Sequence, residues 1–246
     1  MVENKMHEMH SRKISFRELI RWSASIYLRY FHYILGISLF VNLPVHIIGQ
    51  FLPARFAITT TDLVEQNMER ILPYIYFTAA VFVIFAPLAI AATTSLTQQA
   101  LKGDGISIPA MLDASLQKWH KHIITMFFIV SVVLVTSCLF VLAFYVAVAV
   151  CLAASIVSVS DLWGFAAMKE SNRLVFGSKK FVALLFLLRS TAEFGIFPLV
   201  TTAAAHANIA VRLLGGLVSN VLLSFFSVMF AVFFINILSL KGLQNA

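Results

Sequence analysis

Long apolar blocks separated by short polar segments run along the whole chain. A hydrocarbon core of about 30 Å needs roughly 20 apolar residues in a helix, and four blocks meet this need with one helix each: residues 30–52, 71–96, 181–205 and 213–240. Residues 123–160 contain no charged side chain, and as one helix they would measure about 57 Å. We therefore expect two helices there that turn near residues 144–147. The alternative is one long protruding helix, since no Gly or Pro marks the turn.

The polar segments between the blocks are amphipathic. In residues 15–29 most apolar side chains share one side of a helix, and Ser15 with Glu18 three residues later predicts a capping box. Residues 107–122 are also amphipathic, and residues 158–180 carry four basic side chains between two apolar blocks. We expect all three segments to form helices on the cytoplasmic membrane surface. The expected interfacial anchors are Trp119, Lys121, Lys179 and Lys180.

The distribution of basic residues predicts how these helices are oriented. With the N-terminus in the cytoplasm, 14 of the 18 Lys and Arg residues fall in cytoplasmic segments and 3 in outer segments, as the positive-inside rule requires. The prediction is an all-α, polytopic membrane helix bundle of about six transmembrane helices, with both termini cytoplasmic. It comprises a basic amphipathic segment at residues 1–29 and a six-helix transmembrane domain at residues 30–246.

Composition favours a membrane protein and argues against other classes. Hydrophobic residues make up 60% of the 246 residues and charged residues 12%, against roughly 25% charged in a typical soluble domain. Basic membrane ends explain the net charge of +7, so no nucleic-acid partner is expected. Cys138 and Cys151 form no CxxC pair, and His120 and His122 lack further ligands at metal-binding spacing. No metal or other cofactor is expected.

A weak internal repeat has a period of 57 residues. It aligns Ala110-Met111 with Ala167-Met168. Each aligned segment leaves one membrane helix and enters the next, which predicts a repeated helix hairpin. Transporters often contain such repeats, but the match is short, and chance similarity is the alternative.

The stretch at residues 160–177 carries a pattern typical of one group of membrane proteins. Its sequence, SDLWGFAAMKESNRLVFG, resembles the acidic–x–x–G–x–x–A–x–x–x–S–x–x–L–x–x–G segment of six-helix bacterial membrane proteins. These include the membrane domain of some glycerophosphodiester phosphodiesterases and the YciC-type inner-membrane proteins. The resemblance implies a six-helix fold in the bacterial inner (plasma) membrane, although the family's Pro-Gly break between its third and fourth helices is absent here. The small residues of the pattern predict close packing of this helix against a neighbour: Gly164, Ala167, Ser171 and Gly177.

Arg189 and Glu193 are the sharpest candidates for a functional site. They lie four residues apart within the block 181–205 and therefore on the same helix face. Charges inside a membrane helix usually face the bundle interior or a water-filled cavity. We interpret this membrane-embedded polar pair either as a site for an ion, a proton or a lipid headgroup, or as a self-neutralising pair that fixes helix packing.

The chain contains no recognisable catalytic motif. It has no GxSxG sequence, no P-loop and no HExxH sequence, so we expect no enzyme and assign no catalytic residue.

The first hypothesis is a non-enzymatic integral membrane protein that acts as an accessory or interaction subunit in lipid or membrane homeostasis. The alternative is a small transporter or permease subunit for an apolar or lipid-like substrate. The expected partners are membrane lipids and another membrane protein or complex.

Overall fold

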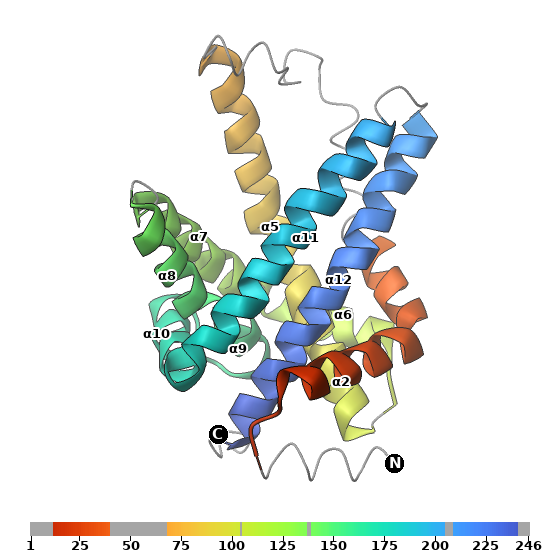
Figure 1. Ribbon diagram of the computed structural model, residues 1–246, viewed down its shortest axis with the longest axis vertical. Coiled ribbons are helices and arrows are strands. Elements are labelled where there is room, and N and C mark those ends of the chain that lie inside the picture. The colour runs from red at the N-terminus through yellow and green to blue at the C-terminus, as the bar shows by residue number, and fades with distance from the viewer. Residues whose placement is uncertain (1–11, 40–67, 104, 137–138, 205–208, 241–246) are drawn as a thin grey trace.

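Helices make up nearly all of the described chain (Figure 1). The computed structural model describes residues 12–39, 68–103, 105–136, 139–204 and 209–240, and it contains no strand in these ranges, which confirms the all-α prediction. A helical stretch at residues 31–39 follows the first labelled helix. The labelled elements are α2 (Phe16–Arg29), α5 (Met68–Lys102), α6 (Ile108–Gln117), α7 (Trp119–Thr136), α8 (Phe140–Val150), α9 (Ala153–Val159), α10 (Gly164–Val175), η2 (Phe176–Ser178), α11 (Lys179–Ala204) and α12 (Ile209–Leu240).

The three longest labelled helices form the frame of the molecule. α5, α11 and α12 contain 35, 26 and 32 residues, and α12 packs against both of the others and against α2. Figure 1 shows α5, α11 and α12 extending beyond the turn between α7 and α8. Every residue of α12 from Val228 to Ile237 is buried, so this part of α12 is the centre of the core. In the predicted topology it lies in the half of α12 nearer the cytoplasm.

Three helical stretches of the described chain are long and apolar enough to cross a membrane. They are Trp119–Thr136, Val141–Val159 and Leu214–Leu240. Many large apolar side chains on α7 and α8 are exposed, among them Phe127, Val135 and Val141, as expected of a surface solvated by lipid. These findings support a membrane protein. The six-helix count stays a prediction, and most of the predicted helix 30–52 lies outside the described residues.

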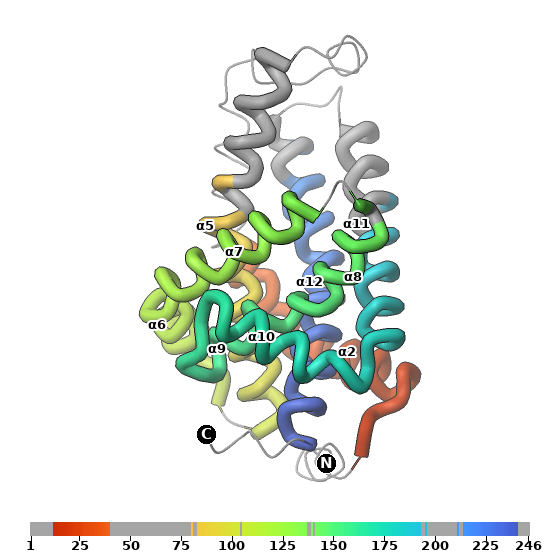
Figure 2. Tube along the Cα trace, turned by 90° about the vertical axis from the view of Figure 1, so that its left-hand side faces the viewer, coloured from red at the N-terminus to blue at the C-terminus, as the bar shows by residue number. Residues whose placement is uncertain are grey.

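Residues 123–160 form separate helices, as predicted, but residues 144–147 lie inside α8 and form no turn, and the alternative of one long helix was wrong. α7 ends at Thr136 and α8 begins at Phe140, and the two helices pack against each other as a hairpin (Figure 2). The Thr136 hydroxyl donates to the carbonyls of Val132 (2.8 Å) and Val133 (3.1 Å). No Gly or Pro marks this turn in the sequence.

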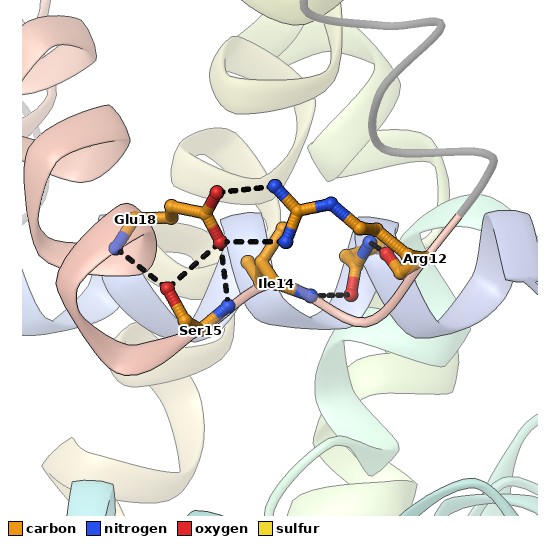
Figure 3. Close-up of polar contacts among 5 residues, drawn as sticks. Arg12, Ile14, Ser15 and Glu18 are labelled. Atoms are coloured by element: carbon orange, nitrogen blue, oxygen red, sulfur yellow. Dashed lines mark hydrogen bonds and ion pairs between the residues drawn. The ribbon is translucent and has the colours of Figure 1, made fainter.

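The N-terminal helix α2 is capped as predicted (Figure 3). Ser15 and Glu18 form a capping box, in which the Ser15 hydroxyl accepts from the backbone N–H of Glu18 and the Glu18 carboxylate accepts from the backbone N–H of Ser15. Arg12 also donates to the Glu18 carboxylate. The hydrogen bond from Arg12, followed by those from Ser15, lowers the pKa of Glu18 to about 2, so this carboxylate stays charged at neutral pH.

Hydrogen bonds at both ends of α2 tie it to α12. Near its start, the backbone N–H of Ile14 donates to the side-chain oxygen of Asn236 (3.3 Å), and the Asn236 amide donates to the carbonyl of Arg12 (3.1 Å). Near its end, the Tyr27 hydroxyl donates to the carbonyl of Val221 (2.6 Å). The predicted surface helix therefore lies against the bundle, with Trp22 on its buried face.

The two segments aligned by the 57-residue period have similar local structures. Each is a short helix, α6 or α10, that leads directly into a longer helix, α7 or α11. The aligned Met111 and Met168 are both buried. A full repeated hairpin stays a prediction.

Candidate functional site

A cavity of about 470 Å³ lies among α5, α7, α8, α9, α11 and α12. Most of its wall is aliphatic or aromatic, with Met126, Ile129, Phe186 and Phe230 as examples. Its volume falls within the range of about 300–1,000 Å³ that is usual for small-molecule sites. An apolar wall of this kind suits a hydrocarbon chain.

The cavity wall also has a polar component. Arg189 and Ser190 contribute to it from α11, and Thr94 and Ser155 contribute from α5 and α9. The Thr94 hydroxyl donates to the carbonyl of Ile90 (2.8 Å) and also reaches the Ser155 hydroxyl at 3.3 Å, which links α5 to α9. A cation in a cavity wall is suited to an anionic group of a ligand.

The structure therefore places one member of the predicted polar pair in the cavity wall. Arg189 is half-buried there. Residue 193 lies one turn further along α11, but the side chain of Glu193 is outside what the structure describes. The pairing of Arg189 with Glu193 stays a prediction.

The cavity wall depends on a break between α8 and α9. α8 ends at Val150 and α9 begins at Ala153, and Val150, Cys151 and Ala154 line the cavity on either side of the break. Ser171 of α10 bridges the break, because its hydroxyl donates to the carbonyl of Ala149 (2.8 Å) and accepts from the backbone N–H of Leu152 (3.2 Å). One buried hydroxyl thus satisfies two backbone groups that the break would otherwise leave unpaired.

Gly164 begins α10 in a backbone conformation that favours glycine. Its φ angle is +57°, and its backbone N–H donates to the Thr125 hydroxyl of α7 (2.7 Å). A Cβ atom placed on Gly164 would lie 3.7 Å from the Phe128 ring, which is an ordinary contact. Close packing was the predicted reason for glycine at position 164. The left-handed φ angle explains glycine there better.

We expect Gly164→Ala to lower the free energy of unfolding by about 1–2 kcal/mol, because alanine is strained in the left-handed region. Gly105→Ala is the matched control, since Gly105 is exposed, has no neighbour within 4 Å of a built Cβ and needs no positive φ. Its effect should stay within about 0.5 kcal/mol. Thermal unfolding in detergent, followed by tryptophan fluorescence, measures both. Equal stability of the two variants would show that the φ angle of Gly164 carries no cost.

The other two small residues of the 160–177 pattern differ in their surroundings. Ala167 is fully buried on the packed face of α10. Gly177 is exposed in η2, and its carbonyl accepts from the ammonium group of Lys13 (3.2 Å). Gly177 thus lies outside the packed face.

Two of the predicted interfacial anchors make contacts within the bundle. The indole N–H of Trp119 donates to the carbonyl of Ile84 in α5 (2.9 Å). The ammonium group of Lys121 lies 3.4 Å from the Asp161 carboxylate. Both side chains join α7 to its neighbours.

The other two anchors lie at the start of α11. The ammonium group of Lys179 lies 4.5 Å from the centre of the Tyr145 ring of α8 and also donates to the Tyr145 hydroxyl. Lys180 is exposed. Contact with lipid headgroups stays a prediction for all four anchors.

Metal-ligating side chains do not gather in the described part of the chain. No group of three or more His, Cys, Asp or Glu residues lies together there. His122 is buried in α7, and Cys151 lines the cavity. Cys138 lies outside the described residues.

Comparison with known proteins yields no relative. No family model, no curated protein and no solved structure matches the chain. The resemblance of residues 160–177 to six-helix bacterial membrane proteins therefore stays a prediction, and the function is inferred from the cavity itself. Sequence patterns did not indicate the contributions of Thr94 and Ser155, because isolated Ser and Thr residues are common in membrane helices and carry no spacing signal.

Proposed function

We propose that this chain is a multi-pass integral membrane protein that binds an anionic, lipid-like amphiphile in the cavity among α5, α7, α8, α9, α11 and α12. The observation that carries the proposal is the position of Arg189 in a wall that is otherwise mainly apolar. The apolar wall would hold the hydrocarbon chain, and Arg189 would bind the anionic group. Guanidinium groups suit this task because they stay charged and bind carboxylate and phosphate oxygens in pairs.

We further propose a location in the bacterial inner membrane with the basic end of the bundle in the cytoplasm. Figure 1 shows α2, the C-terminal end of α5 and the N-terminal end of α11 at the same end of the molecule. These segments carry a large share of the described Lys and Arg residues, including Arg17, Arg21, Lys102, Lys179 and Lys180. The positive-inside rule favours this orientation, and the resemblance of residues 160–177 favours a bacterial membrane.

In the favoured role the protein is a non-enzymatic accessory subunit that holds the amphiphile for a membrane partner. A small transporter of the same amphiphile is the second candidate, because the helix break at Cys151 and Leu152 adjoins the cavity and transporters often place broken helices at their substrate sites. Transport of a fluorescent fatty acid across proteoliposome membranes would favour the second role. Copurification of a membrane partner without transport would favour the first.

Oleate and oleyl alcohol test the proposed ligand chemistry, because they share a hydrocarbon chain and differ in charge. In neutral detergent, oleate should raise the unfolding temperature in a saturable way, and oleyl alcohol should raise it much less. Ala147→Leu should abolish the oleate effect, since Ala147 lines the cavity. Ala143→Leu, on the same helix one turn away and equally half-buried, is the matched control and should retain it. Equal shifts with both ligands, or an unchanged shift in Ala147→Leu, would contradict the proposal.

A further inference from the structure

A second recess lies at the basic end of the bundle, where the N-terminal segment meets α11 and α12. Its volume is about 540 Å³. Its walls come from three stretches that are far apart in the sequence: residues 13–14, 176–181 and 233–237. None of these residues lines the cavity that contains Arg189, so the two hollows are separate.

Three lysines line this recess, and no acidic side chain does. Lys13 comes from the N-terminal segment, and Lys179 and Lys180 come from the start of α11. No ion pair joins any of the three to a carboxylate of the described residues. The nearby carboxylates of Glu18 and Glu170 are already paired, with Arg12 and Arg173 respectively. The recess therefore presents positive charge that the described chain does not neutralise.

The floor of the recess is apolar. Phe181 stacks on Phe233 with ring centres 5.0 Å apart, and Ile14 and Ile237 are buried beside them. A free phosphate ion gains no favourable contact from an apolar floor. A phospholipid can use both, because its phosphate group is joined through glycerol to apolar acyl chains. The combination of lysines and apolar floor thus favours a lipid headgroup.

The fold holds the N-terminal wall of the recess in place. Asn236 is buried in the recess wall and is hydrogen-bonded to the backbone of both Ile14 and Arg12. Figure 3 shows Ile14 and Arg12 in this position, next to the capping box of α2. Lys13 lies between these two residues, and its ammonium group reaches the carbonyl of Gly177 on the opposite wall (3.2 Å).

We propose that this recess binds the phosphate group of an anionic phospholipid. Lys13 and Lys180 contact the phosphate oxygens, Lys179 adds charge while it stays packed on Tyr145, and the acyl chains leave along the apolar floor. The inference goes beyond the amphiphile cavity, because it assigns a second site of different composition at the membrane surface.

Native mass spectrometry with phosphatidylglycerol and phosphatidylcholine tests the proposal. The wild-type protein should retain phosphatidylglycerol in preference to phosphatidylcholine. Each lysine near a membrane surface contributes about fivefold to the binding of anionic lipid, so the double variant Lys13→Gln, Lys180→Gln should bind phosphatidylglycerol about 25-fold more weakly. The matched control is Lys102→Gln, Lys169→Gln, which removes the same charge from two other exposed lysines. It should change the affinity by less than about twofold.

A competition experiment and further variants distinguish the lipid site from its alternatives. Excess inorganic phosphate should not displace phosphatidylglycerol, and complete displacement would overturn the assignment to a lipid. Equal losses in the two double variants would overturn the recess in favour of a diffuse basic surface. If the Lys13, Lys180 double variant does not fold, Lys180→Gln alone should show about a fivefold loss. Ala147→Leu should bind phosphatidylglycerol normally, which separates a failure here from a failure of the amphiphile cavity.

Discussion

Replacement of Arg189 with leucine should weaken the binding of oleate by about tenfold to a hundredfold. A hydrogen bond that involves a charged group contributes about 1.5–3 kcal/mol, and each 1.4 kcal/mol corresponds to a factor of ten in affinity. The effect should be large because the rest of the cavity wall offers oleate mainly apolar contacts. Binding of oleyl alcohol should change little, since it lacks the carboxylate.

The matched control for this variant is Arg173→Leu. Arg173 is exposed on α10, where it pairs with Glu170, and it does not line the cavity. Titration of both variants with oleate in neutral detergent measures the difference. Arg189→Gln, which keeps a hydrogen-bond donor on a shorter side chain without the charge, serves if leucine prevents folding. An affinity of the Arg189 variants equal to that of Arg173→Leu would assign Arg189 a role in helix packing instead.

Loss of the Ser171 hydroxyl should have the second large effect. Ser171→Ala leaves the carbonyl of Ala149 and the N–H of Leu152 without their bonds to α10. A buried polar group that loses its partner costs about 1–3 kcal/mol, and Ser171 itself is fully buried. We expect a decrease of this size in the free energy of unfolding. Because Val150 and Ala154 lie on either side of the break and line the cavity, oleate binding should weaken as well.

Ser115→Ala provides the control for this second variant. The Ser115 hydroxyl is also buried, but it donates only to the carbonyl of Met111 one turn back in its own helix. Removal of such a bond should change stability by less than about 0.5 kcal/mol, since it slightly opposes the helix ladder. Chemical unfolding of both variants in mixed micelles compares them directly. Similar stabilities would mean that the α8–α9 break does not depend on Ser171.

The sequence predicted the helices much better than the breaks between them. The amphipathic pattern and the capping signal placed α2, and Ser15 with Glu18 forms the expected capping box. The turn expected in the uncharged run 123–160 was placed wrongly, and the break at Leu152 was not predicted, because no Gly or Pro marks either position. The break at Leu152 is bridged by the Ser171 hydroxyl, which comes from a different helix. Hydropathy contains no information on such contacts.

The candidate site was predicted only in part for a similar reason. A charge inside an apolar block stands out, so Arg189 was found from the sequence alone. The cavity around it is formed by six helices, and nothing in the sequence indicates which faces of those helices meet. Ser155 and Thr94 contribute to the cavity through contacts between α9 and α5. Gly164 was singled out for its small size, whereas its φ angle of +57° gives the stronger reason for glycine.

Photo-crosslinking with a diazirine-bearing fatty acid tests the central claim most directly, because it reports where an anionic amphiphile lies. We predict that the label concentrates on cavity-lining stretches of α9 and α11, around Ala154 and Phe186, and that excess oleate suppresses it. A label spread over the exposed apolar residues of the α7–α8 hairpin, such as Val135 and Val141, and insensitive to oleate would contradict the account.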